Sequence, residues 1–153
     1  MSTTRPIATD VGAAPDATVR LPRIDVRLRI AALWVAIMLV FAYVDLFSLY
    51  RPDVRAGLEQ GTIALFEVDQ IFLLLVTVYV AVPAAMIYLS LVLPHRANRL
   101  ANIALPTLYS ITIIGAAIGE WGYFIFGSVL EVVLLALIIV HSVQWRRVPV
   151  PAR

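Results

Sequence analysis

The sequence predicts an all-α integral membrane protein: a four-helix bundle that alternates up-down-up-down, with both termini cytoplasmic. Three observations support this fold class. Hydrophobic residues make up 61% of the 153 residues, well above the share in soluble domains. The charged residues gather in short segments between long apolar runs, as they do in proteins that cross a membrane several times. The arginines are distributed unevenly among those segments, which indicates an orientation.

The amino-terminal half of the chain contains a tail and two predicted spans. Residues 1–27 are polar and rich in Pro, Thr, Ala and Asp, so we expect a disordered cytoplasmic tail. The transmembrane domain is predicted over residues 28–145. Its first span, residues 28–49, is too long for a signal-peptide core and is expected to be an uncleaved anchor. The second span, residues 69–93, contains Pro83, which membrane helices tolerate.

The apolar run from Leu100 to Trp145 must turn back on itself. As one helix it would be roughly 69 Å long, over twice the hydrocarbon thickness of a bilayer. The segment GEWG, residues 119–122, is the polar, glycine-rich interruption near its middle. It predicts a tight hairpin between spans 100–119 and 123–145, followed by a short cytoplasmic tail at 146–153.

The arginines set the predicted orientation. All 12 basic residues are arginine, and with the amino terminus inside only Arg51 and Arg55 lie in outer segments, which leaves 12 − 2 = 10 inside. An odd number of spans would place one terminal arginine cluster outside, against the positive-inside rule. We therefore expect a multi-pass protein of the inner (cytoplasmic) membrane.

The outer segments carry most of the acids, which makes that face attractive to cations. The alternative explanation is that acids simply occupy loops from which arginine is excluded, which produces the same bias. These acids are Asp45, Asp53, Glu59, Glu67, Asp69 and Glu120. Within the outer loop 51–67, Pro52 suits the first position of a short interfacial helix and Gly61 suits the position just past its end.

The chain resembles a family of small bacterial four-helix membrane proteins, a domain of unknown function. The matching stretches are DVRLRIAALWVAIMLVFAYVDLFSLY, Gln70, PAAMIYLSLVLP followed by NRLAN, and FGSVLEVVLLALIIV. They cover residues 24–145, nearly everything but the tails. The resemblance implies four spans and an inner-membrane location, and it implies no particular activity.

Glu131 interrupts the apolar stretch at residues 126–140, with no arginine within two turns on either side. An acid at the centre of a membrane helix costs roughly 2.5–3.5 kcal/mol on insertion-derived scales, so something must offset it. At about 1.5 Å per residue, Glu131 lies roughly 12 Å from the outer end of its span. The other spans place Asp45, Thr77 and Thr112 in the same layer.

The helical positions of two acids indicate which way they face. Asp45 and Tyr43 are about 200° apart on their helix, and we expect Asp45 to face inward because a lipid-facing carboxylate costs more. Glu131 belongs to a stripe of small, polar and apolar residues that suits close helix contact. That stripe contains Gly127, Ser128, Glu131, Leu135, Ile138 and Ser142.

Two interpretations of Glu131 stay open. In the functional one, its carboxyl is a protonatable site lining an outward-opening cavity, as in proton-coupled carriers. In the structural one, a protonated carboxyl hydrogen-bonds to Thr77, Thr112 or Ser128 and holds the helices together.

Two further groups of residues suggest contacts. Gly115 and Gly119 form a small-xxx-small pair that we expect to pack within the chain, with a homo-oligomer face as the alternative. Gly127 is a further predicted packing position. Asn98 is expected to cap the third span. Arginines near the inner face are expected to contact lipid headgroups, namely Arg96, Arg99, Arg146 and Arg147.

The function that these features favour is a small transporter or permeation protein that uses an intramembrane carboxylate. It would work in the lipid bilayer as a homo-oligomer and accept a proton or a small cationic solute. The alternative is a non-catalytic accessory or scaffold subunit of a membrane complex. An enzyme is the least supported class, because the sequence contains no phosphate loop, nucleophile elbow or dinucleotide fingerprint.

No cofactor, metal site or nucleic-acid partner is expected. The two histidines, His95 and His141, both lie near the inner face. Haem ligation needs two imidazoles that face each other across a bundle, and a turn residue after Pro94 is unsuited to that role.

Reporter fusions test the predicted topology. Fusions placed after Arg55 and after Arg153 should report opposite sides of the membrane, because an odd number of spans separates the two points in a four-span chain. Signals from the same side would show that the topology is wrong.

Overall fold

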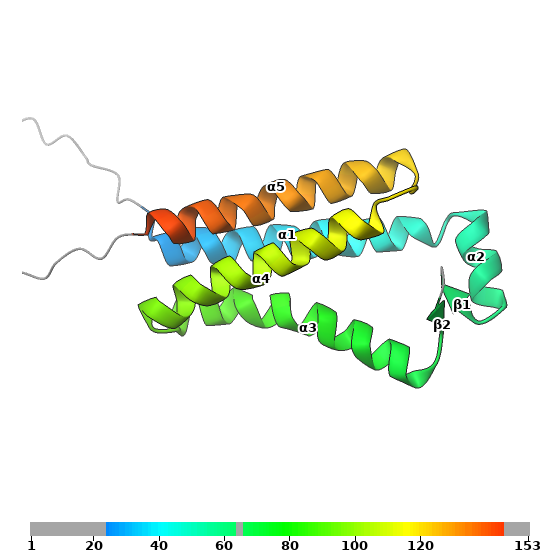
Figure 1. Ribbon diagram of the computed structural model, residues 1–153, viewed down its shortest axis with the longest axis horizontal. Helices are drawn as coiled ribbons and strands as arrows, with labels where there is room; N and C mark the ends of the chain where they lie inside the picture. Colours follow the sequence, from blue (N-terminus) through cyan, green and yellow to red (C-terminus); the bar gives the residue numbers. More distant parts are fainter. Residues whose placement is uncertain (1–23, 64–65, 146–153) are drawn as a thin grey trace, which may run out of the picture.

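A computed structural model describes residues 24–63 and 66–145 (Figure 1). Within these residues the chain forms five helices and one antiparallel pair of two-residue strands. The elements are α1 (Val26–Ser48), α2 (Pro52–Glu59), β1 (Thr62–Ile63), β2 (Phe66–Glu67), α3 (Gln70–Val92), α4 (His95–Ala116) and α5 (Gly122–Gln144). The predicted tails fall almost wholly outside the described residues.

The helix count differs from the predicted four because the outer loop folds into α2. Pro52 occupies the first turn of this helix and Gly61, with a φ of 75°, follows its end, as their positions in the sequence predict. Three helices, α1, α3 and α5, are long and apolar enough to cross a membrane. The 22-residue α4 has a similar length, but its first turns carry arginine and asparagine. The four-span topology therefore stays a prediction.

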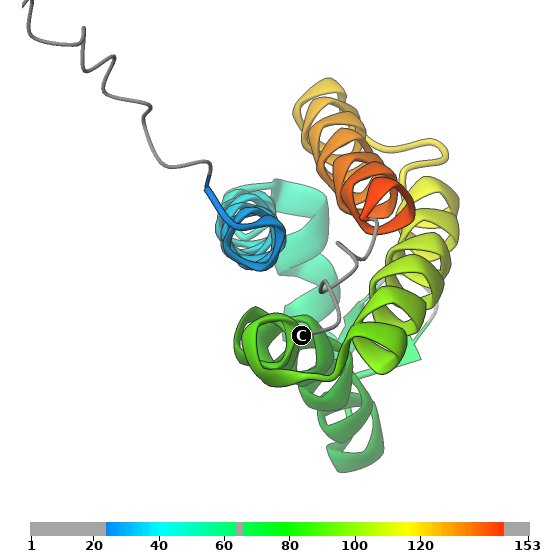
Figure 2. The ribbon, with the colours of Figure 1, turned by 90° about the vertical axis from the view of Figure 1, so that its left-hand side faces the viewer.

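The four long helices alternate in direction along one axis (Figure 1). We call the end where α1 and α4 begin the arginine end, and the end with α2 and both strands the loop end. Viewed along the axis, the helices follow one another in the order α3, α1, α5, α4 (Figure 2). Close contacts join α3 to α1, α1 to α5 and α5 to α4, whereas α3 and α4 share few. Beyond the turn that links them, α3 diverges from α4.

Local signals in the sequence set the helix starts. The Asp25 side chain accepts a 2.7 Å hydrogen bond from the Arg27 amide, and Asp69 accepts one of the same length from the Phe72 amide. Each carboxylate thereby satisfies an amide that the first turn leaves free. α4 begins at His95, about five residues before the predicted span. The expectation that Asn98 caps this helix is wrong, because Asn98 lies inside it.

A fully buried polar network crosses the core near the arginine end. Asn102 Oδ1 accepts hydrogen bonds from Trp34 Nε1 at 2.7 Å and from Ser90 Oγ at 3.4 Å. The Asn102 amide donates to the backbone oxygen of Asn98 at 3.0 Å, and the Asn98 amide donates to the backbone oxygen of Ser90 at 2.6 Å. The network ties α4 to both α1 and α3. The Trp34 side chain is fully buried in this network.

Apolar side chains surround this network and complete the core. Since lipid tails are as apolar as leucine, close packing and hydrogen bonds rather than removal from water favour helix association in a membrane. The buried apolar cluster contains Ile30, Trp34, Ile37, Met86, Tyr109, Ile113, Leu135 and Ile138.

One glycine allows the closest approach between two helices. A Cβ atom at Gly127 on α5 would overlap the Val44 side chain on α1. Gly127 is therefore a packing residue, as predicted. The same expectation is wrong for Gly115 and Gly119, because a Cβ atom at either would have no atom within 4 Å. Gly119 instead adopts a φ of 82°, which forms the turn before α5.

Substitution of Gly127 tests this approach. Gly127→Ala should lower the free energy of unfolding by about 1–3 kcal/mol, because the added methyl group forces α1 and α5 apart. Val44→Ala in the same chain should restore much of the loss, which would show as coupling between the two sites in thermal unfolding in detergent.

Gly115→Ala is the matched control for this substitution. It adds the same methyl group at an open helical position and should be neutral or slightly stabilising. Equal losses for Gly127→Ala and Gly115→Ala would contradict a specific α1–α5 contact.

Candidate functional site

Glu131 faces the interior of the helix assembly. Its residue is 4% exposed, and the whole stripe predicted around it forms the buried face of α5. Glu131 lies one turn beyond Gly127, the point where α5 comes closest to α1. The close approach therefore brings this part of α5 against α1.

The hydrogen-bond partners expected for Glu131 are not in place. Thr77 is exposed and its hydroxyl donates to the backbone oxygen of Leu73 at 2.7 Å, so the expectation that it serves Glu131 is wrong. Ser128 is buried on the Glu131 stripe but makes no hydrogen bond to it. Among the described residues, no group hydrogen-bonds the Glu131 carboxyl, and the structural interpretation loses its proposed partners.

Burial is the main influence on the Glu131 carboxyl, and Asp45 on α1 is the charged group within electrostatic range of it. It follows Phe41 by one helical turn, on the face of α1 that also carries Trp34, whereas the exposed Tyr43 lies on the opposite face. Asp45 is itself exposed. The two acids thus form a carboxyl pair with one buried and one exposed member.

Two tyrosines link the carboxyl pair to α3 and α4. Tyr79 OH shares a 2.7 Å hydrogen bond with Thr112 Oγ1, and both acids act electrostatically on Tyr79. Tyr109 OH donates to the backbone oxygen of Tyr79 at 2.5 Å, and the two rings lie 4.6 Å apart. Thr112 thus belongs to the layer, through Tyr79 rather than through Glu131.

Sequence reasoning missed Tyr79 and Tyr109, although a signal was present. Tyr79 shares one face of α3 with Pro83, Met86 and Ser90, all of them buried, at spacings of four, three and four. A tyrosine on the buried face of an apolar helix needs a hydrogen-bond partner for its hydroxyl. That requirement predicts a polar group on the neighbouring helix.

An arginine fastens the loop end. Arg51, just after α1, pairs with Asp53 at 2.5 Å and with Glu120 in the turn before α5. Its guanidinium carbon lies 4.8 Å from the centre of the Trp121 ring. The Asp53 and Glu120 hydrogen bonds raise the pKa of Arg51, and the Arg51 guanidinium lowers the pKa of Asp53 below its ordinary value of 3.8. Two acids of the loop end thereby share one arginine within the chain.

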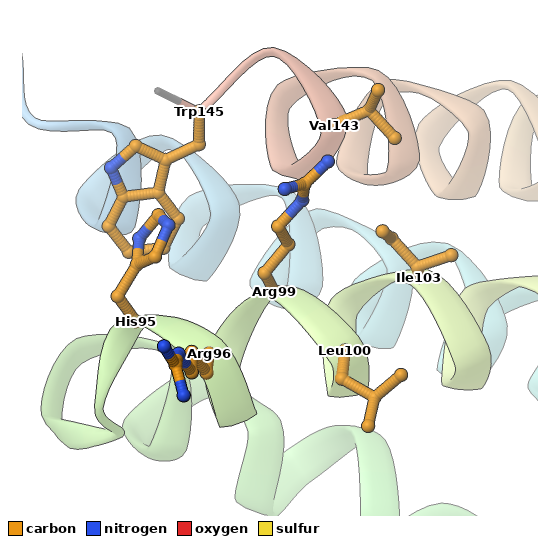
Figure 3. A pocket seen from close by; sticks show the side chains of 7 residues that line it. All are labelled: His95, Arg96, Arg99, Leu100, Ile103, Val143 and Trp145. Atoms are coloured by element: carbon orange, nitrogen blue, oxygen red, sulfur yellow. The ribbon is translucent and has the colours of Figure 1, made fainter. Parts of the chain in front are cut away.

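The arginine end contains a groove of about 830 Å³ between the start of α4 and the end of α5 (Figure 3). Arg96 and Arg99, predicted to contact lipid headgroups, line it together with His95 and Trp145. The His95 and Trp145 rings meet edge to face with centroids 4.6 Å apart. Arg146 and Arg147, predicted for the same role, lie outside the described residues.

The part of the chain that the structure describes brings together no group of three or more His, Cys, Asp or Glu residues that could hold a metal ion. The Ser142 hydroxyl, on the Glu131 stripe, is buried without a hydrogen-bond partner in the same part of the chain.

Comparison with known proteins gives one result. Residues 25–151 match a family described as a family of unknown function (DUF6326). No curated protein and no solved structure matches the chain significantly. The resemblance to an uncharacterised family is thereby confirmed.

The Arg51–Asp53 pair predicts a dependence of stability on pH. The pKa of Asp53 is lower in the folded chain than in the unfolded chain, so the pair stabilises the fold above the ordinary value and its contribution is lost as the pH falls below about 3.8. The midpoint temperature of thermal unfolding of the wild type should therefore decrease as the pH is lowered from about 5 to about 3.

Two variants isolate this contribution. Asp53→Asn lacks the titrating carboxyl, so its unfolding midpoint should decrease less than that of the wild type at low pH. Glu59→Gln changes an exposed acid of the same helix that makes no ion pair in the described chain, and its midpoint should decrease as much as that of the wild type. Identical profiles for the wild type and Asp53→Asn would contradict the pairing.

Proposed function

The protein belongs to this family of unknown function, and we propose that it is a multi-pass membrane transporter or permeation protein for a proton or small cation. In this proposal, Glu131 and Asp45 form the binding site. The single observation that carries it is a carboxyl buried to 4% exposure that lies within electrostatic range of Asp45 and has no hydrogen-bond partner among the described residues.

The surface of the helices supports a location in a membrane. α3 leaves most of its apolar side chains exposed, and α1 and α5 expose many of theirs. Large apolar side chains exposed along whole helices are rare in soluble monomers. Lipid tails or a partner helix would cover such a surface and keep its apolar side chains away from water. The arginines at the other end of these helices suit the cytoplasmic headgroup layer, which supports four spans with both termini inside.

The carboxyl pair supports binding of a single positive charge. Two nearby carboxylates repel each other, and burial of a charged carboxylate without a partner is unfavourable. A shared proton or cation reduces both the repulsion and the cost of burial. Oxygen atoms are the ligands that small hard cations prefer. The hydroxyls of Tyr79 and Thr112, hydrogen-bonded beside the pair, add neutral oxygen atoms to the same layer.

The polarity of the two ends supports access from one side. Asp45 is exposed toward the loop end, where α3 diverges (Figure 1). Toward the arginine end, the Trp34–Asn102 network and the apolar cluster fill the core. A charge that reaches Glu131 from the loop end therefore meets a closed core, and its release to the other side requires a rearrangement of the helices, as in alternating access.

A second function, that of a non-catalytic accessory or scaffold subunit, is favoured by α3. This helix contacts α1 and leaves its other faces exposed, which suits a partner helix. A homo-oligomer of the transporter would use the same surface.

Proton flux into liposomes separates the two functions. The purified wild-type chain, reconstituted with a pH-sensitive dye inside, should admit protons under an imposed potential. Glu131→Gln keeps shape and hydrogen-bonding capacity but cannot release a proton, and it should lower the rate at least about a hundredfold. Glu67→Gln, at an exposed acid of the loop end, is the control and should conduct like the wild type.

A pH-dependent reaction of Glu131 with a carbodiimide would add support, because it requires a carboxyl that titrates and is reachable. A wild-type chain without proton flux, or Glu131→Gln with unchanged flux, would favour the scaffold over the transporter. Thermal unfolding of each variant in detergent distinguishes loss of function from loss of fold.

A further inference from the structure

The groove at the arginine end changes from charged to apolar along its length. Four residues that line the groove share one face of α4, because they are separated by three, one and three positions. They are Arg96, Arg99, Leu100 and Ile103. Ile103 lies roughly 10 Å further along the helix axis than Arg96, away from the arginine end. Val143 of α5 and Trp145, which directly follows α5, form the opposite wall (Figure 3). A phospholipid has this same order of polarity from headgroup to acyl chain.

The two arginines are available to a ligand. Arg96 and Arg99 are exposed, and neither makes an ion pair or a hydrogen bond with the described part of the chain. Arg27 and Arg51 differ in this respect: Arg27 donates to the backbone oxygen of Leu91 at 2.8 Å, and Arg51 pairs with two acids. Arg99 extends from α4 toward α5 in Figure 3. Two guanidinium groups one turn apart can hold one phosphate between them.

Two further features favour an anion here. Both arginines lie in the first turns of α4, where the helix dipole is positive, and no side chain caps this helix. The Trp145 ring is held in position, with the Arg27 guanidinium carbon 5.4 Å from its centre. Tryptophan beside arginine is typical of the headgroup layer of a membrane.

We propose that this groove binds one anionic phospholipid, with its phosphate between Arg96 and Arg99 and an acyl chain along Leu100, Ile103 and Val143. The apolar half of the wall favours a lipid over free phosphate, which would leave these side chains uncovered. The site rests on the membrane location in the proposed function and is independent of transport through Glu131.

Native mass spectrometry of the full chain in detergent tests the site. Phosphatidylglycerol should bind more tightly than phosphatidylcholine with the same acyl chains. Arg96→Gln with Arg99→Gln should weaken phosphatidylglycerol binding about 25-fold, at about fivefold for each arginine, and should weaken phosphatidylcholine binding less, because its choline cation offsets the charge of the phosphate. Arg55→Gln removes an exposed arginine at the loop end and should have no effect.

The apolar wall is tested separately. Ile103→Ala with Val143→Ala should weaken phosphatidylglycerol binding, and glycerol phosphate without acyl chains should compete poorly. Full competition by glycerol phosphate would overturn the lipid assignment in favour of a soluble anion. Equal binding of both lipids, or equal effects of the Arg96/Arg99 and Arg55 changes, would overturn the site.

Two readouts keep this proposal apart from the transport proposal. Glu131→Gln should bind phosphatidylglycerol like the wild type, because Glu131 does not line the groove. A chain that binds the lipid specifically but moves no protons would refute transport alone. A chain that moves protons but does not distinguish the two lipids would refute the groove alone.

Discussion

The hydrogen bond from Trp34 to Asn102 is the interaction on which the arrangement of the helices depends. Inside a membrane, burial of apolar side chains does not select one neighbour over another, because lipid tails offer the same environment. A fully buried indole and amide do select, since each loses a partner in any other arrangement. Through Asn98 and Ser90 the same network fixes α4 against α3. The register of α1, α3 and α4 follows from it.

The register set at the arginine end determines what meets at the carboxyl pair. Gly127 then brings α5 against α1, and Glu131, one turn beyond it, comes to face the helix that carries Asp45. Tyr79 and Tyr109 lie between the Trp34–Asn102 network and the loop end, and they contact each other through a hydrogen bond and their rings. Contacts nearer the arginine end therefore position this part of the site. The site is thus a product of helix pairing and not of any local motif.

Hydrophobic periodicity predicted the parts of this fold that depend on one helix at a time. It gave the long helices to within a few residues and the buried stripe of α5 around Glu131. It failed at the start of α4, because the polar segment HRANR hides a helix whose asparagines point into the core. It failed at Thr77, because depth alone says nothing of direction: Thr77 lies about 200° from Tyr79, on the outer face of α3. Hydrophobic periodicity could not predict the asparagine network, because that network depends on which helices are neighbours.

The few contacts between α3 and α4 have a mechanical consequence. Toward the loop end, the described side chains of these two helices are joined by hydrogen bonds at Tyr79 and by its ring contact with Tyr109. Hydrogen bonds of this kind in membranes are worth about 0.6 kcal/mol each, and an aromatic pair about 0.5–1.5 kcal/mol. Separating these side chains therefore costs about 2–3 kcal/mol. Among the described side chains, Tyr79 thus carries most of the connection between α3 and α4 toward the loop end, and a change at this one residue would loosen the attachment of α3.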